Sequence, residues 1–228
     1  MTATVRLEAR PGPIELGLDT SAVIVNDMQN AFVSPGGYLD KAGFDIAGAG
    51  AVVDAVDTTL EAARAAGLPV FYFRNGFDAE LHAAAAGSPW RVKSHALRLM
   101  RERPELEGTL LIRGSWDHDI VDALTPKPGD VVVDKTRPSC FAGTELQMML
   151  NARGIRGIVV VGIASNVGVE WTLRDGLSRE FFGIMLEDAT MPAGPGYLQA
   201  ATVFNVETFI GWVSTSAAFA DAFGAGRR

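Results

Sequence analysis

The sequence predicts an α/β fold, a doubly wound (Rossmann-like) parallel sheet with helices on both faces. Two observations predict it. Short apolar runs rich in valine and isoleucine alternate along the chain with helical patterns, which is the order of elements in a parallel sheet joined by crossover helices. The runs are also nearly continuous, as strands buried on both faces require. Right-handed crossovers then leave few topologies, of which the doubly wound sheet is the first choice.

The expected strands are six runs in which β-branched, aromatic and other large apolar residues dominate. In chain order they lie at residues 22–25, 70–73, 110–112, 131–133, 158–161 and 184–186. The expected helices show apolar residues recurring at helical spacing. They lie at residues 51–66, 97–103, 120–124, 144–153, 167–179, 197–209 and 215–223. Because no linker, repeat or low-complexity tract interrupts this order, residues 1–228 are expected to form one domain.

The composition excludes several classes of protein. The chain has 228 residues, 48% of them hydrophobic, which is enough for one large domain with a buried core. A net charge of −7 without any basic run argues against a nucleic-acid or acidic-membrane surface. No stretch is long and apolar enough to span a bilayer, and residues 1–10 contain no apolar signal core. A single cysteine, Cys140, excludes an internal disulfide framework and favours a cytoplasmic location.

Two long irregular stretches follow expected strands, at residues 34–47 and 75–93. Loops of this length in one domain tend to be functional. Ligands of doubly wound sheets bind beyond the carboxyl ends of the strands. We therefore expect both stretches to overhang a binding site, with surface decoration as the alternative.

Asp27 and Lys135 each follow a strand-like run and are the first candidates for chemistry. Apolar walls at a strand end can raise the pKa of the Asp27 carboxyl, and an ion pair with Lys135 would leave that carboxylate ready to move protons. Taken singly, Asp27 could equally be a turn cap and Lys135 a solvated loop residue. Together they favour an acid–base pair.

The segment from Val161 to Glu170 runs from an apolar strand into a helix start. Ser165 or Asn166 could cap this helix, and Gly168 would lie in its first turn, where backbone N–H groups favour negative charge. Glycine cannot act as a nucleophile, but it leaves room for a water molecule or for part of a substrate. A tight helix–sheet contact would equally account for it.

Other residues are weaker candidates for the site. Cys140 could be a nucleophile, although a lone cysteine before a phenylalanine is more often a small buried hydrophobe. The glycines at 48 and 50 follow no strand and lack the third glycine of a dinucleotide fingerprint. The acidic and histidine residues at 117–119 resemble a metal cluster, but their position favours a charged helix start. No metal and no cofactor are expected.

Several motifs together resemble the isochorismatase-like (cysteine hydrolase) superfamily, and an amidohydrolase branch of it in particular. The resemblance extends through most of the chain. It includes Asp27 with the Met-Gln-Asn that follows it, Lys135, and the helix start near Gly168. The further matching segments are 36–40, 75–76, 114–117, 172–176, 186–190 and 204–209.

The resemblance implies a six-stranded parallel sheet and a homodimer or homotetramer. It implies that Asp27 is the general acid/base, that Lys135 is its partner, and that Ile163–Ala164 is a non-proline cis peptide orienting N–H groups toward an oxyanion. At the position of Gly168, amidases of the group have a nucleophilic cysteine, whereas true isochorismatases have glycine. Residues expected to bind the substrate are Phe32, Tyr38, Asn75, Phe77, Glu80, Trp90, Cys140 and Asn166.

The expected function is hydrolysis of a small planar unsaturated molecule by Asp27 and water, without a thioester at Gly168. Cleavage of a C–N bond in an amide, ureido or enamine group ranks slightly above cleavage of a vinyl ether. An amidase with Cys140 as a relocated nucleophile and an inactive small-molecule binding protein stay as alternatives. An anionic substrate group could meet one of five cations: Arg74, Arg91, Lys93, His95 or Arg137.

Overall fold

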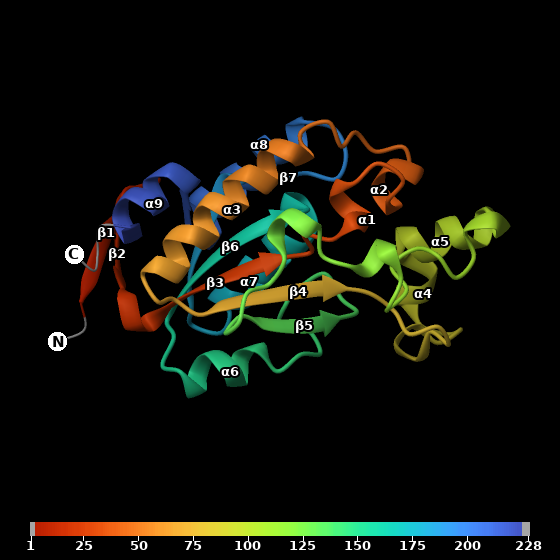
Figure 1. Cartoon of the computed structure of the whole chain (residues 1–228), viewed down its shortest axis with the longest axis horizontal. Coiled ribbons are helices and arrows are strands. Elements are labelled where there is room, and N and C mark those ends of the chain that lie inside the picture. Colours follow the sequence, from red (N-terminus) through yellow and green to blue (C-terminus); the bar gives the residue numbers. More distant parts are fainter. Residues whose placement is uncertain (1–2, 225–228) are drawn as a thin grey trace.

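A six-stranded sheet runs through the middle of the molecule, and all of its strand pairs are parallel (Figure 1). The computed structural model describes residues 3–224. The strand order across the sheet is β5-β4-β3-β6-β7-β8. The strands are β3 (Ser21–Asn26), β4 (Val70–Asn75), β5 (Val131–Lys135), β6 (Gly157–Ile163), β7 (Phe182–Met191) and β8 (Trp212–Ser214).

Alternate residues of the central strand β3 face two different cores. Val23 and Val25 pack into the core that contains α3 (Ala49–Ala65) and α9 (Ser216–Gly224). Ala22 and Ile24 pack into the core under α6 (Leu146–Ala152) and α7 (Glu170–Leu177). Because successive side chains of a strand point to opposite faces, this division shows helices covering both faces of the sheet. The predicted doubly wound architecture is confirmed.

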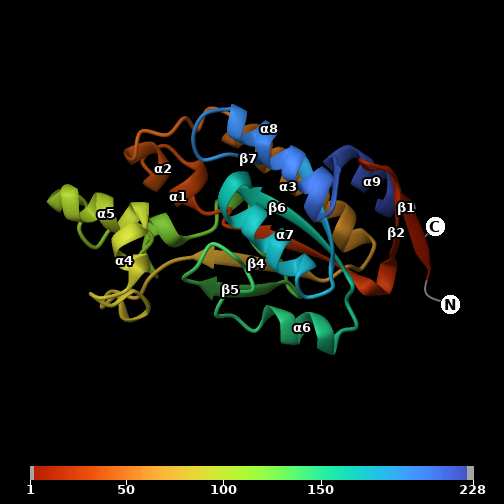
Figure 2. The same cartoon turned by 180° about the vertical axis from the view of Figure 1, so that it is seen from behind.

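The carboxyl ends of the strands meet a group of short helices. In Figure 1 the arrows of β3, β4 and β5 point toward them, and Figure 2 shows the same arrangement from behind. These helices are α1 (Asn30–Val33), α2 (Tyr38–Lys41), α4 (Pro89–Lys93) and α5 (His95–Glu102). Two of them, α2 and α4, lie within the stretches expected to be irregular.

Several expected elements differ from the observed ones. Residues 110–112 form no strand, since Leu111 has a left-handed φ of 55° and Ile112 makes only an isolated bridge with Phe77. The sixth strand is β8 instead. An antiparallel hairpin of β1 (Thr4–Leu7) and β2 (Ile14–Gly17) was not expected.

The remaining helical segments are single 3₁₀ or π-helical turns, two of which adjoin a longer helix. The expected helix at 120–124 is reduced to a 3₁₀ turn at Asp122–Leu124, and that at 167–179 is replaced by a π-helical turn at Ser165–Val169 followed by α7. Helix α8 (Tyr197–Asn205) likewise runs into a π-helical turn. That π-helical turn spans Val206–Ile210. The other 3₁₀ turns span Leu18–Thr20, His82–Ala84, Pro104–Leu106 and Trp116–His118.

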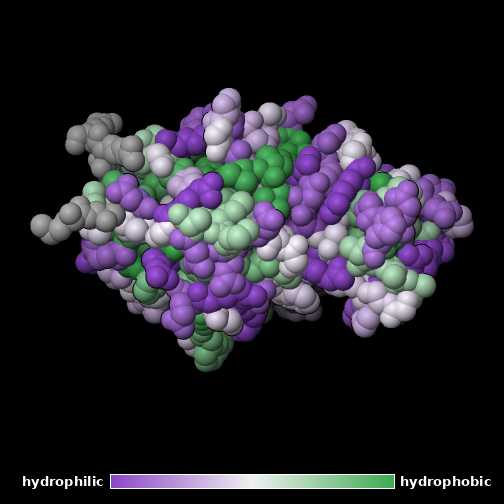
Figure 3. Space-filling view, turned by 90° about the horizontal axis from the view of Figure 1, so that it is seen from below, coloured by the Kyte–Doolittle hydropathy of each residue, from purple (hydrophilic) through white to green (hydrophobic). Residues whose placement is uncertain are grey.

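The surface is largely hydrophilic. On the face shown in Figure 3, hydrophobic residues gather in patches on the wider part of the molecule, bordered by hydrophilic residues. Among residues 3–224, no helix has the length and apolar character needed to cross a membrane.

Candidate active site

Asp27 and Lys135 form a buried ion pair at the carboxyl ends of the strands. The Lys135 Nζ lies 2.7 Å from the Asp27 Oδ2 and also donates to the backbone carbonyls of Arg137 (3.2 Å) and Pro138 (2.9 Å). The strands that carry the pair are not neighbours, because β4 lies between them. The long lysine side chain spans that distance, so the predicted pairing is present although its strands are not adjacent.

Burial dominates the electrostatics of this pair. Asp27 is 4% exposed and Lys135 is 1% exposed. Loss of water raises the pKa of the Asp27 carboxyl above its ordinary value, while the Lys135 ammonium and, after it, the backbone of Asn75 and the side chain of Asn26 act in the opposite direction. The backbone of Asp27 is left-handed, with a φ of 54°, a conformation that residues other than glycine rarely adopt. A raised pKa and an unusual backbone in one buried carboxylate are typical of a reactive group.

The helix start after β6 lies against this pair. The Ile163–Ala164 peptide is cis, as expected. No side chain caps the turn, contrary to the expectation for Ser165 or Asn166. The Asn166 side chain instead bridges to the backbone of Ala193, accepting from its N–H at 3.0 Å and donating to its carbonyl at 3.2 Å.

Gly168 is buried, and the space into which a side chain would extend is filled by Asn26. A Cβ atom there would lie 2.9 Å from both the Cγ and the Oδ1 of Asn26, and closer still to its Nδ2. A side chain at residue 168 would therefore meet Asn26, in agreement with the alternative of a tight contact between the sheet and the following helix. Gly168 also lines the cavity over the site, so the room expected for a water molecule or for substrate beside it stays a prediction.

A cavity of about 390 Å³ lies over these groups. Asp27 and Gly168 form part of its wall, and both long loops contribute, through Tyr38 from one and Trp90 from the other. The remaining lining residues are Phe32, Leu39, Phe44, Asn75, Lys93, Ser94, His95, Ala96, Leu111, Pro138, Ile163, Ala164, Val167, Trp171 and Ala193. The position of the cavity agrees with the rule that such sheets bind ligands beyond their strand ends.

Three polar atoms of the cavity wall are buried without a hydrogen-bond partner among the described residues. They are the Oδ1 of Asp27, the Oδ1 of Asn75 and the Nε1 of Trp90. The first two accept hydrogen bonds and the third donates one. Buried polar atoms are normally satisfied, so atoms left open around a cavity indicate what a ligand there would supply. The complement is a small molecule with N–H or O–H donors at one part and an oxygen acceptor at another.

The structure brings most of the predicted site residues together. Lys135 pairs with Asp27 without lining the cavity, and four predicted substrate-binding residues also lie outside the lining. Phe77 is buried beneath the loop, where its N–H donates to the Leu111 carbonyl at 2.8 Å. Glu80 is exposed at the surface. Asn166 points to Ala193, as described, and Cys140 lies within the protein. These four do not meet the expected substrate position.

Cys140 has the environment of a structural thiol. It is fully buried, its Sγ donates to the Asn26 Oδ1 at 3.1 Å, and burial raises the pKa of the thiol to about 12. A nucleophilic cysteine needs a lowered pKa and access to the substrate. Neither condition holds at Cys140, which argues against a relocated nucleophile.

The five candidate cations have different surroundings. Lys93 and His95 line the cavity. Arg74 pairs with Asp134 at 2.9 Å, and the Arg137 guanidinium lies 5.3 Å from the centre of the Trp90 ring. Lys93 is exposed, is not in any ion pair of the described chain, and is therefore the cation best placed for a substrate anion.

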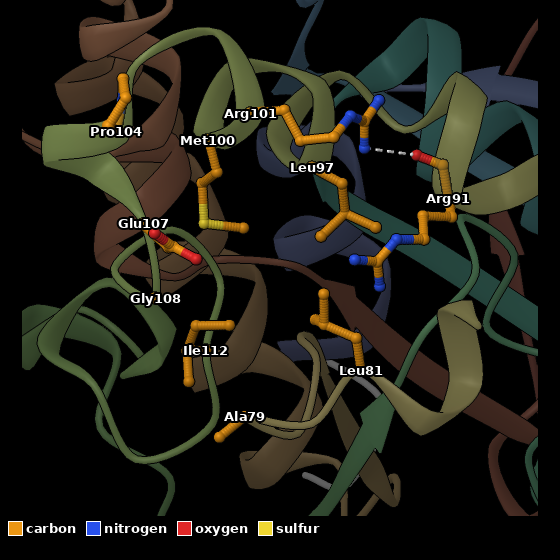
Figure 4. A pocket seen from close by; sticks show the side chains of 10 residues that line it. All are labelled: Ala79, Leu81, Arg91, Leu97, Met100, Arg101, Pro104, Glu107, Gly108 and Ile112. Carbon is orange, nitrogen blue, oxygen red and sulfur yellow. Dashed lines mark hydrogen bonds between the residues drawn. The ribbon is translucent and has the colours of Figure 1, made fainter. Parts of the chain in front are cut away.

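Arg91 belongs to a second hollow of about 490 Å³, between α5 and residues 104–112 (Figure 4). It shares no lining residue with the Asp27 cavity. Arg91 and Arg101 both donate to backbone carbonyls, one of which is drawn as a dashed line in Figure 4. These arginines hold the α4–α5 region together, and Glu107, the acidic residue of this wall, is exposed.

Within the expected charged helix start at 117–119, Asp117 is instead a buried anchor. The Asp117 carboxylate accepts hydrogen bonds from the backbone N–H groups of Tyr38 (3.1 Å) and Leu111 (2.7 Å). It thereby holds two cavity-lining loops against each other. The sequence gives no sign of this role, because Tyr38 is 79 residues from Asp117 in the chain.

Asn26 is the residue near the site that sequence reasoning missed. It is fully buried at the end of β3 and contacts both Gly168 and Asp27. A signal was present, since a polar asparagine ends an otherwise apolar strand directly before the candidate acid.

Comparisons with known proteins agree with this architecture. The family model described as "Isochorismatase domain" matches residues 21–218. The ureidoacrylate amidohydrolase RutB of Azorhizobium caulinodans is 56% identical, over 95% of this chain and 96% of its own length.

Two solved structures have a similar fold. A cysteine hydrolase from Pseudomonas syringae pv. phaseolicola superposes with a TM-score of 0.78 at 28% identity, covering 92% of this chain and 95% of its own. An N-carbamoylsarcosine amidase from Thermoplasma acidophilum gives a TM-score of 0.66 at 25% identity, covering 86% of this chain and 96% of its own.

Proposed function

The chain belongs to the isochorismatase family of hydrolases, and from this premise we propose that it cleaves a C–N bond in the ureido or amide group of a small planar unsaturated carboxylate. Ureidoacrylate is the first candidate substrate. The name of the Azorhizobium relative supports it, and the amidase similar in fold is named for another carbamoyl compound.

The open polar atoms of the cavity carry this proposal. A ureido group offers N–H donors to the Oδ1 atoms of Asp27 and Asn75, and an oxygen of the substrate can accept from the Nε1 of Trp90. The aromatic rings of Phe32 and Tyr38 suit a flat, unsaturated molecule. Lys93 at the wall supplies a positive charge for the carboxylate.

The proposed reaction uses water as the nucleophile. The Asp27 carboxylate takes a proton from water while the water oxygen bonds to the carbamoyl carbon. The proton then passes to the leaving nitrogen, the C–N bond breaks, and an amine and carbamic acid are formed. Lys135 holds the second carboxylate oxygen and offsets the cost of a buried negative charge.

Proton donation to a vinyl carbon is a second candidate, favoured by the raised pKa of Asp27. A protonated Asp27 would donate to the carbon, and water would add to the cation that forms. On ureidoacrylate this route breaks the vinyl C–N bond and releases urea. On a vinyl ether it breaks the C–O bond.

A product assay tests the proposal. The protein is incubated with ureidoacrylate, maleamate or an isochorismate-type vinyl ether, and ammonia, urea and enol products are measured. We expect ammonia without urea from ureidoacrylate, because carbamic acid decomposes to ammonia and carbon dioxide. Urea would instead support the vinyl route. Thermal stabilisation by all three compounds with no product from any would indicate a binding protein.

Asp27→Asn provides the matched variant for this assay. It keeps the size of the side chain and an oxygen that can accept from Lys135, but removes the group that transfers the proton. We expect turnover to fall by about 10²–10⁴-fold, the usual contribution of general acid–base catalysis. Parent-like activity in this variant would show that Asp27 is not the acid–base group.

A further inference from the structure

Asn26 occupies a space that exists only because residue 168 is glycine. Any side chain at 168 would overlap the Asn26 amide, as the built Cβ position shows. Backbone conformation does not require glycine here, since Gly168 is absent from the residues with positive φ. The requirement comes from the close approach of the Asn26 side chain.

The Asn26 amide is held on three sides. Its Nδ2 donates to the Ile163 carbonyl at 3.0 Å and to the Asp27 Oδ2 at 3.1 Å, and its Oδ1 accepts from the Cys140 Sγ at 3.1 Å. All of these groups are buried, so the amide has one orientation in which every polar atom is satisfied.

In this arrangement the two oxygens of the Asp27 carboxylate have different hydrogen-bond environments. Oδ2 accepts from both the Lys135 Nζ and the Asn26 Nδ2, whereas Oδ1 has no partner among the described residues. Two donors on one oxygen restrict rotation of the carboxylate. The oxygen left open belongs to a residue of the cavity wall.

We propose that Asn26, seated against Gly168, is a positioning residue that fixes the Asp27 carboxylate and keeps one oxygen free for the substrate. The inference rests on the proposed function, because it assigns Asn26 a part in the same proton transfer. Asn26 does not line the cavity and acts only through Asp27. Gly168 is then a steric requirement for this amide.

Asn26→Ala tests the positioning role. Removing the Asn26 amide leaves Lys135 as the remaining side chain that donates to the Asp27 carboxylate. We expect kcat on ureidoacrylate to fall about 10- to 100-fold with KM changed less than about threefold, since the lost contact orients a catalytic group and does not bind substrate. Asn205→Ala is the control. The Asn205 amide, on α8, donates to Glu170 of α7 at 3.2 Å, and its removal should leave kcat unchanged.

A substrate-free measurement separates this inference from the proposed function. The hydrogen bond from Asn26 favours the ionised form of Asp27, so its loss raises the Asp27 pKa. Lys135 and Cys140 are the titratable groups that face the carboxyl, and both remain in the variant. A ¹³C NMR titration should therefore show the Asp27 carboxyl titrating at higher pH in Asn26→Ala than in the parent.

Gly168→Ala, alone and with Asn26→Ala, tests the steric link. The single change should lower both the Tm and kcat, because the new methyl group displaces the amide. Adding Asn26→Ala should restore the Tm but not kcat. This pattern distinguishes positioning from simple packing, and it can be measured even if Asn26→Ala alone folds poorly.

The outcomes are distinct. An unmoved Asp27 pKa together with parent-like kcat in either variant lacking Asn26 would overturn the inference. A parent protein that hydrolyses none of the three substrates, with the pKa raised in Asn26→Ala, would contradict the proposed function and leave Asn26 as the group that orients Asp27.

Discussion

At the scale of single residues, the pH dependence of turnover separates the two roles available to Asp27. Its pKa is raised above the ordinary 3.8. A carboxylate that removes a proton from water must be ionised, so kcat/KM should rise with pH through the raised pKa and be lost as the pH falls below it. A pH–rate profile on ureidoacrylate checks the sign. Activity that instead falls as the pH rises through that pKa would assign Asp27 the proton-donating role.

Cys140 provides a second prediction at this scale. Cys140→Ser keeps a donor for the Asn26 Oδ1 but removes the thiol. We expect kcat to stay within roughly threefold of the parent, because a buried thiol of raised pKa does not attack substrate. Rates of the two proteins, measured side by side, check this. Abolished turnover in a folded variant would restore the relocated nucleophile.

At the scale of elements, α4 carries the predicted contact with the substrate carboxylate. Lys93→Met keeps the long side chain and removes the charge. We expect KM for ureidoacrylate to rise roughly 2- to 10-fold with little change in kcat, since an exposed ion pair contributes modestly to binding. Lys127→Met, in the loop before β5, is the matched control. A KM equal to the parent's would move the anion contact to another residue.

The elements also show where sequence reasoning succeeds. Runs such as 22–25 and 158–161 are predictable as strands because strands buried on both faces must be apolar throughout. The run at 110–112 has the same apolar character, and its prediction as a strand is wrong. Leu110 and Leu111 are buried in a loop, and burial alone gives a loop the same apolar pattern as a strand. Strand β8 has three residues, too few for a pattern.

Among the site residues, too, some can be predicted from the sequence pattern and others cannot. Asp27 and Lys135 are predictable because Asp27 directly follows one strand and Lys135 ends another, and strand ends meet at one edge of a parallel sheet. Asn26 and Asp117 could not be given their roles. The first depends on the close approach of a side chain to Gly168, and the second on contacts between loops distant in sequence.

For the molecule as a whole, the homo-oligomer implied by the family resemblance stays a prediction, and the surface of α8 and of the π-helical turn after it indicates where it would form. Tyr197, Phe204 and Phe209 are 69%, 61% and 68% exposed. Tyr197 and Phe204 are seven residues apart and so share a helix face. The ring centroids of Phe204 and Phe209 are 6.1 Å apart. Exposed aromatic side chains gathered in this way are typical of protein–protein interfaces.

Phe204→Glu should therefore shift the protein toward a monomer, because a charge cannot be buried unpaired between two copies of the helix. Light scattering coupled to size-exclusion chromatography measures the mass directly. Met148→Glu is the matched control, since Met148 is 63% exposed on α6 and lies outside the aromatic group. An unchanged oligomer in Phe204→Glu would place the interface elsewhere, and a monomeric parent would contradict the oligomer itself.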